Sequence, residues 1–143
     1  MPRGATLIEL LLALAVLAVV LAIAAPGLRE SRDRLLAREW AAALVAAHGR
    51  ARHAALAEQR VMLLTISADS VLLRAVAAPG DTQERWRTAG PARDGVALSG
   101  GPRTIAFAPS GVAFGLANAT YTLRRGAATK QVIVSRYGRV RVP

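Results

Sequence analysis

The sequence contains no cysteine and only two histidines. Without cysteine the fold has neither disulfide bonds nor thiolate metal sites. His48 and His53 are five positions apart, so they would not share a helix face as two metal ligands do, and we expect surface or capping roles for both. There is no Gly-x-Ser-x-Gly nucleophile motif and no phosphate-binding glycine-rich loop with a lysine. We therefore expect a binding or assembly protein, with no catalytic residue, metal or cofactor.

Acidic residues are also scarce. Nine Asp and Glu residues face 19 Lys and Arg residues, which gives a formal net charge of +10 at pH 7. This balance favours an anionic partner such as nucleic acid or a lipid surface, although a total charge alone is explained equally well by solubility. The 143 residues leave room for one domain with a modest core beside the N-terminal segment.

Charge is almost absent from the N-terminal segment. From Ala5 to Leu28 the only charged side chain is Glu9, and Leu10–Ala25 is an unbroken apolar run. A helix of this length, at about 1.5 Å per residue, approaches the thickness of a bilayer core. The charged leader Met1–Gly4 is very short, and no small-residue cleavage site closes the apolar run, so the segment is retained rather than removed as a secretory signal. An unpartnered acid in lipid costs about 2.5 kcal/mol or more, so Glu9 needs a partner or a function.

The residues Gly4-Ala5-Thr6-Leu7-Ile8-Glu9-Leu10 resemble the class III signal of type IV prepilins and type II secretion pseudopilins. The resemblance implies that a prepilin peptidase cuts after Gly4 and methylates Ala5, where the family usually has phenylalanine. It also implies that Glu9 meets the N-terminal ammonium of a neighbouring subunit, which would offset the cost of burying it. The alternative is a simple membrane anchor with an isolated acid.

A second helical pattern follows the apolar run. Pro26-Gly27 should kink or interrupt the helix near the membrane edge. Beyond it an amphipathic helix is predicted to run to about Glu58. Its apolar stripe is formed by Leu28, Leu35, Leu36, Trp40, Leu44 and Val45. The chain then divides into a leader (1–4), a transmembrane and assembly helix (5–27) and a soluble domain (28–143).

Short β-type runs replace the helical pattern after Gln59. Val61–Ile66 and Val71–Val76 flank a Ser-Ala-Asp-Ser turn and predict a hairpin, and Glu84–Thr88 predicts a third strand. Glycine and proline predict a loop over Ala89–Arg103. Four more strands are predicted at Thr104–Ala108, Thr120–Arg124, Thr129–Ser135 and Arg139–Val142. The fold class is α+β and pilin-like, with a long N-terminal helix packed on a C-terminal antiparallel β domain.

Three C-terminal segments resemble the GspH/FimT family of minor pilins and pseudopilins: Ile105–Gly111, Tyr121–Leu123 and Val132–Arg141. The resemblance implies a low-abundance subunit at or near the tip of a pilus or pseudopilus, with other pilins as partners. It also implies an anchor in the bacterial inner membrane and a periplasmic soluble domain.

The last part of the chain is basic throughout. Asp94 is the last acid, and the basic residues beyond it are Arg103, Arg124, Arg125, Lys130, Arg136, Arg139 and Arg141. In the last strand Arg139 and Arg141 would share a face about 7 Å apart, with Val140 and Val142 toward the core. This spacing suits successive backbone phosphates, and the planar fork of each arginine can bind two oxygens of one phosphate. Gly138 would let a polyanion approach the backbone. The alternative is a solvated edge strand protected by charge.

The segment Gly138-Arg139-Val140-Arg141 resembles the GRxR motif of FimT-like minor pilins, which bind DNA for uptake in natural transformation. This implies non-specific binding of double-stranded DNA, mainly through phosphates, with Arg124, Arg125, Lys130 and Arg136 as further contacts. For Tyr121 and Tyr137 a buried or strand-paired role is favoured over stacking on bases. Similar endings occur in relatives assigned to secretion. A type II secretion pseudopilin and a purely structural priming minor pilin are therefore the alternatives.

The Gly4-Ala5 junction yields a prediction about processing. Mass spectrometry of protein isolated from its native membrane should show a chain that begins at methylated Ala5. Functional material that retains Met1 or Pro2 would contradict the prepilin interpretation.

Overall fold

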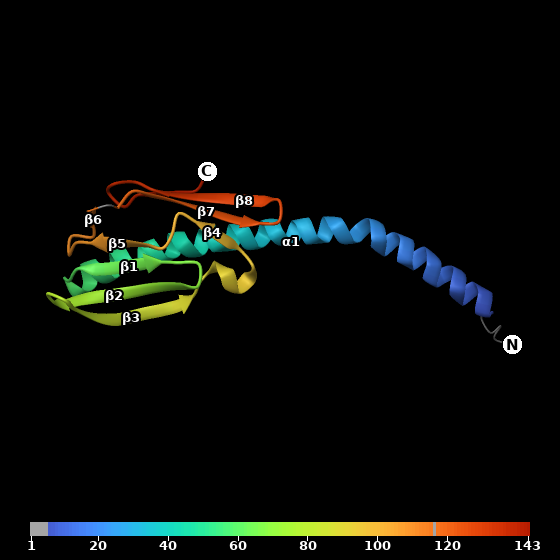
Figure 1. Cartoon of the computed structure of the whole chain (residues 1–143), viewed down its shortest axis with the longest axis horizontal. Helices are drawn as coiled ribbons and strands as arrows, with labels where there is room; N and C mark the ends of the chain where they lie inside the picture. Colours follow the sequence, from blue (N-terminus) through green and yellow to red (C-terminus); the bar gives the residue numbers. More distant parts are fainter. Residues whose placement is uncertain (1–5, 116) are drawn as a thin grey trace. The chain divides into compact units, whose positions relative to one another are not determined.

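The computed structural model of the chain describes residues 6–115 and 117–143, so the predicted processing residues Gly4 and Ala5 lie outside it. Helix α1 (Leu7–Glu58) comes first, and a β domain follows it (Figure 1). The later elements are β1 (Met62–Ile66), β2 (Ser70–Ala78), β3 (Asp81–Ala89), the 3-10 helix η1 (Pro91–Asp94), β4 (Ala97–Ser99), β5 (Arg103–Phe107), β6 (Ala113–Phe114), β7 (Ala119–Arg125), β8 (Ala128–Val134) and β9 (Val140–Arg141). The predicted α+β class is confirmed.

Helix α1 is more continuous than its sequence suggests. It ends at Glu58, as predicted, but Pro26 and Gly27 do not interrupt it. A proline inside a helix removes one backbone hydrogen bond, and the turns on either side keep theirs. The chain divides between Arg32 and Asp33 into two compact units, which are described separately below.

In the second unit, α1 turns a stripe of small residues toward the sheets. Its buried positions are Ala37, Ala41, Leu44, Ala47, His48, Ala51 and Ala55. They recur every three or four residues and therefore lie on one face of the helix. The predicted stripe of large residues is only partly right, because Leu28, Leu35 and Val45 are exposed. Alanine gives a weak sequence signal, but its short side chain lets a helix approach a sheet closely.

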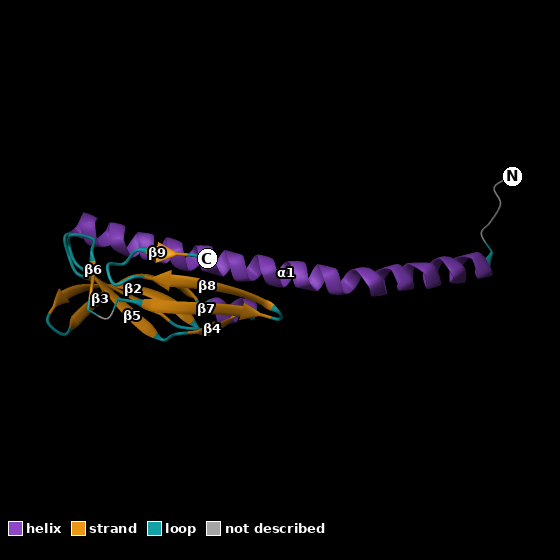
Figure 2. Ribbon diagram, turned by 90° about the horizontal axis from the view of Figure 1, so that it is seen from above, coloured by secondary structure: helices purple, strands orange, loops and turns teal. Residues whose placement is uncertain are grey.

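The strands form two antiparallel sheets. The five-stranded sheet has the order β3-β2-β1-β5-β6, and the four-stranded sheet has the order β4-β7-β8-β9. The predicted hairpin is confirmed, with Ile66 paired to Val71 across its turn. The second half of α1 lies along the β domain, with β9 beside it (Figure 2). The alanine face and the inner faces of both sheets enclose a core whose largest buried side chains include Tyr121, Phe107 and Met62.

The segment between Ala89 and Arg103 is not the plain loop that its glycines and prolines predicted. It contains η1 and the three-residue strand β4, which pairs Leu98 with Leu123 of β7. Gly95, with φ 69°, ends η1, and its N–H donates back to the Ala92 carbonyl. Strand β6 was also missed. Elements as short as these do not produce a hydrophobic period.

His48 is buried, so the predicted surface or capping role is wrong for it, whereas His53 is exposed. The Nδ1 atom of His48 lies 2.8 Å from the Leu44 carbonyl, which can only accept, so neutral His48 carries its proton on Nδ1. Nε2 has no hydrogen-bond partner among the described residues. The rings of Phe107 on β5 and Tyr121 on β7 lie beside the imidazole, each with its centroid 6.3 Å away. Burial in these surroundings lowers the pKa of His48.

We predict that acid destabilises the domain through His48. The unfolded chain takes up a proton near the ordinary pKa of 6.5, while the folded chain resists it. Stability should therefore be level above about pH 6.5 and fall below it by up to about 1.4 kcal/mol per pH unit. Urea unfolding of a soluble fragment that begins at Leu28, at about pH 7.5 and about pH 5.5, measures this.

His48→Leu should remove this part of the pH dependence, while His53→Leu should keep it, because His53 is exposed in the folded state. Equal pH dependence in the two variants would show that His48 is not the responsible group.

Candidate assembly and nucleic-acid interfaces

Glu9 lies in the first turn of α1 and helps to begin the helix. Thr6, just before the helix, donates its backbone N–H and its hydroxyl to Glu9 Oε2, at 2.7 and 3.0 Å. The Glu9 N–H donates in return to Thr6 Oγ1 at 3.3 Å. This reciprocal pair is a capping box, which satisfies N–H groups that a helix start leaves without partners. Thr6-x-x-Glu9 is the sequence signature of a capping box, so this role of Glu9 was predictable from the sequence.

The helix after Glu9 has an apolar surface on every side. Its large side chains from Leu7 to Ile23 are all more than half exposed. The part of the chain that the structure describes has one helix long and apolar enough, by length and composition, to cross a membrane, with a mean hydropathy of 3.0 over its best window. Such a surface is stable only in contact with lipid or with other apolar helices.

The predicted DNA-contacting residues on sheet β4-β7-β8-β9 and its last turn divide into two groups. Arg124, Arg136, Arg139 and Arg141 are exposed, whereas Arg125 and Lys130 are half-buried. Arg125 Nε donates to Asp33 Oδ1 at 2.7 Å, which ties the end of β7 to α1. Lys130 Nζ lies 3.4 Å from the Pro143 carbonyl. Arg125 therefore has a structural partner that the sequence did not reveal, because the two residues are 92 positions apart.

A tight turn places Arg136 and Tyr137 between β8 and β9. Ser135 and Arg139 pair across it: the Ser135 N–H donates to the Arg139 carbonyl at 2.8 Å, and the Arg139 N–H donates to Ser135 Oγ at 3.1 Å. The Gly138 N–H donates to the Ser135 carbonyl at 2.9 Å. Arg136 is exposed and Tyr137 is 75% exposed, so both project from this turn.

Gly138 is required for this turn. Its φ is +78°, in the left-handed region that favours glycine. A Cβ added there would lie 2.8 Å from the Ala113 Cβ and 3.5 Å from Phe107 Cε1. Packing against the core thus explains why position 138 requires glycine, and no approach of a polyanion to the backbone is needed to explain it.

Strand β9 is shorter than the predicted strand Arg139–Val142, and only one of the two valines in that segment faces the core. Val140 packs against the buried cluster, but Val142 is 45% exposed, so its predicted core position is wrong. The strand pairs with β8 through Arg141 opposite Ile133 and Val140 opposite Val134, and the chain beyond Arg141 leaves the sheet. Arg139 and Arg141 are both exposed on either side of Val140, as the alternation predicted.

The two tyrosines have different environments. Tyr121 is fully buried, and its hydroxyl has no partner among the described residues. Burial raises its pKa to about 12, and the charge of Arg103 opposes the shift. The predicted buried role is thus confirmed for Tyr121, which cannot stack on a base. The predicted buried or strand-paired role is wrong for Tyr137, which is exposed in the turn beside the arginines.

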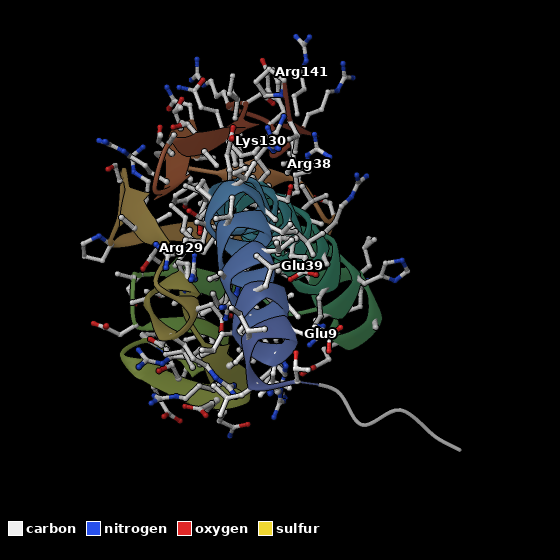
Figure 3. The ribbon with its side chains drawn as sticks, turned by 90° about the vertical axis from the view of Figure 1, so that its right-hand side faces the viewer. Glu9, Arg29, Arg38, Glu39, Lys130 and Arg141 are labelled. Atoms are coloured by element: carbon white, nitrogen blue, oxygen red, sulfur yellow. The ribbon has the colours of Figure 1, made fainter. Side chains whose placement is uncertain are left out.

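Sequence reasoning missed Arg38. Arg38 lines a groove of about 600 Å³, the basic groove, together with Ala41, Ala42, Val45, Lys130 and Val142. Arg38 and Lys130 lie on the same side of the β domain as Arg141 (Figure 3). Nothing in the helical pattern distinguished Arg38 from the other arginines of α1, because only the fold brings it beside β8.

Known proteins share the N-terminal motif and the fold of this chain. Residues 2–25 match the family model of the prokaryotic N-terminal methylation motif. The fold is similar to that of the type IV minor pilin FimU of Pseudomonas aeruginosa, with a TM-score of 0.59 and 14% identity over 74% of this chain and 91% of that chain.

The fold is pilin-like. The minor pseudopilin EpsH from the Type 2 Secretion System of Vibrio cholerae is similar to the same degree, with a TM-score of 0.58 and 14% identity over 75% of this chain and 95% of that chain. No curated protein matches the sequence. The resemblance to minor pilins and pseudopilins is thus confirmed in the N-terminal motif and in the pilin fold of the β domain.

The turn that carries the arginines of this pilin-like fold can be tested through Gly138. Gly138→Ala should cost about 1–2 kcal/mol for the left-handed backbone and about 1–3 kcal/mol more for crowding against Ala113. Gly80→Ala is the matched control, because Gly80 has φ +84° with nothing within 4 Å of its added Cβ. Chemical unfolding of the soluble fragment measures both. An equal loss in the two variants would show that contact with the core does not constrain the turn.

Proposed function

We propose that this chain is a minor pilin at or near the tip of a type IV pilus. Its basic C-terminal region would bind double-stranded DNA without sequence preference, for uptake in natural transformation. The observation that carries the proposal is the exposed group of Arg136, Arg139 and Arg141 around one tight turn. Among the described residues, none of the three forms an ion pair. Arginines without acidic partners are available for phosphates.

The N-terminal half supplies the assembly function in this proposal. Prepilin peptidase would remove the leader (1–4), and residues 5–27 would anchor the chain in the inner membrane and join the fibre. Residues 28–143 would be periplasmic. Glu9 would accept the N-terminal ammonium of an adjacent pilin. The methylation motif and the exposed apolar half of α1 support this arrangement. The protein would act by binding and assembly, with no catalytic step.

The residues proposed to contact DNA differ in how accessible their side chains are. Arg136, Arg139 and Arg141 form the centre, with Tyr137 beside them to stack on an accessible base or sugar. Lys130 on β8 and Arg38 on α1, which both line the basic groove, extend the positive charge from the turn to the helix. Arg124 is exposed at the other end of β7, and Arg125 is the weakest candidate because Asp33 already holds it.

A type II secretion pseudopilin is the second candidate, and one observation favours it. The fold is as similar to the pseudopilin EpsH as to the pilin FimU. A pseudopilin needs the same anchor, the same intersubunit acid and the same β domain. It does not need DNA binding. A priming minor pilin with a purely structural role differs in the same respect, so DNA binding separates the first candidate from both others.

The DNA hypothesis predicts the effect of Arg139→Gln with Arg141→Gln in the soluble fragment. Affinity should fall for every DNA sequence, because the lost contacts are to phosphates. The slope of log K against log salt should flatten by about two, because fewer counterions are released. Titrations with duplex DNA at several salt concentrations measure both quantities.

Two comparisons complete this test. Arg60→Gln with Arg74→Gln removes the same charge from exposed positions outside sheet β4-β7-β8-β9 and should change the slope much less. Arg139→Lys with Arg141→Lys should retain only part of the affinity, because an ammonium lacks the two-pronged contact. If the folded Gln variant keeps its affinity and slope, the pseudopilin becomes the better candidate.

A further inference from the structure

The chain has two tryptophans, and both line one cleft that lies along a different edge of α1 from the basic groove. Trp40 comes from α1 and Trp86 from the edge strand β3. The cleft has a volume of about 240 Å³. Its remaining lining includes Ala43, Ala47 and Val71, with Arg50 at the side. Both indoles are only partly buried, so apolar surface remains open to solvent.

The walls of the cleft are held in place. Trp40 Nε1 donates to Asp94 Oδ2 of η1 at 2.9 Å. The Arg50 guanidinium carbon lies 4.3 Å from the centroid of the Trp86 ring, in a cation–π contact. The register of β2 with β3 shifts beside Trp86, and Arg85 at that shift donates to Glu58 Oε2 from Nε and Nη2, at 2.9 and 2.7 Å. This ion pair ties β3 to the end of α1, so the cleft exists before a partner binds.

The cleft is open because α1 contributes small side chains there. Ala43 and Ala47 leave the space between the two indoles unfilled. Small-molecule pockets usually have volumes of about 300–1,000 Å³, so this cleft is suited to one side chain rather than a whole ligand. Tryptophan and arginine are among the residues that most often dominate binding energy at protein interfaces.

The charges around the cleft define the partner further. Arg50 is exposed and forms no ion pair among the described residues. The acids nearby already have partners: Asp94 holds Trp40, and Glu58 holds Arg85. The cleft is apolar inside, and the Arg50 guanidinium at its side has no acidic partner in the part of the chain that the structure describes. It therefore suits a binding partner that inserts an apolar side chain and places a carboxylate next to Arg50.

Strand β3 provides an approach for a protein chain. It is the last strand of its sheet, and its outer edge pairs with no other strand in the described ranges 6–115 and 117–143. Such an edge offers backbone donors and acceptors to an extended segment, while a pocket beside it selects one side chain. A nucleic acid is less suited to this face, because Glu84 pairs with Arg87 on the same strand and reduces its positive charge.

We propose that the Trp40–Trp86 cleft is a socket for one large apolar side chain flanked by a carboxylate, presented by an adjacent protein subunit of the fibre. The assignment of the partner as a fibre subunit rests on the proposed function. The socket is independent of that function, because its chemistry follows from Trp40, Trp86 and Arg50 alone.

Intrinsic fluorescence tests the socket directly, because the chain's only two tryptophans both line it. The full chain in detergent is titrated with N-acetylphenylalanine and, separately, with its amide. Both should give a saturable change, and the carboxylate should bind about two- to fivefold more tightly through Arg50. Arg50→Gln should abolish this preference. No saturable change with either compound would overturn the socket.

Ala43→Leu and Ala42→Leu form a matched pair of variants. Both alanines are exposed on α1, but Ala43 lines the cleft and Ala42 lines the basic groove. Ala43→Leu should reduce probe affinity at least about tenfold by filling the cleft, while Ala42→Leu should leave it unchanged. Equal responses in the two variants would show that the probe binds elsewhere, for example in the detergent, and would overturn the socket.

Photo-crosslinking tests the partner. A benzoylphenylalanine replaces Ala92, which is exposed on η1 two residues before Asp94. In native membranes it should yield a crosslink to a subunit that carries a prepilin motif. Ala43→Leu should abolish the crosslink, and Ala42→Leu should preserve it.

The outcomes distinguish the existence of the socket from the identity of its partner. Probe binding without a crosslink to a pilin overturns the assignment of the partner and weakens the proposed fibre role. A crosslink that persists in Ala43→Leu overturns the socket and leaves the fibre role intact. Loss of DNA binding in the C-terminal arginine variant changes neither result.

Discussion

The β domain depends on the close approach of α1 to its two sheets. Alanine at most of the buried positions of the helix brings the helix backbone near the strands, and Leu44 and His48 fill the wider spaces. This contact has consequences at both edges of the helix. On one edge it creates the groove that brings Arg38 beside Lys130, and on the other it leaves the space between Trp40 and Trp86 open. Two of the buried alanines also line these hollows, Ala41 in the groove and Ala47 in the cleft.

Much of the fold could be predicted from the sequence, because its signals are local. The apolar run, the long helix to Glu58 and the hairpin around Ser67–Ser70 each follow from a repeating pattern. The predictions fail where the structure depends on contacts between residues that are far apart in the sequence. The alanine stripe, the burial of His48 and the exposure of Val142 depend on how the sheets meet the helix. No periodicity within one element contains that information.

The residues of the candidate DNA site could be predicted from the sequence, but most of their contacts in the fold could not. The basic C-terminal run and the alternation of Arg139 with Arg141 were both visible in the sequence, and both arginines are exposed. The sequence could not show that Asp33 holds Arg125 or that Gly138 packs against Ala113. It also gave no reason to place Arg38 near β8. These relations join residues that lie far apart along the chain, and only the tertiary fold defines them.

In the proposed fibre, assembly through the N-terminal helix depends on the contact that Glu9 makes with an adjacent subunit. The measurement is the amount of Glu9→Gln protein in sheared fibres, relative to the processed protein in the membrane. Glu39→Gln is the control, because Glu39 is an exposed acid on α1 beyond the apolar run. We predict that Glu9→Gln is cleaved and inserted normally but is nearly absent from fibres, while Glu39→Gln is incorporated like the wild type. Incorporation of Glu9→Gln at the wild-type level would contradict the account.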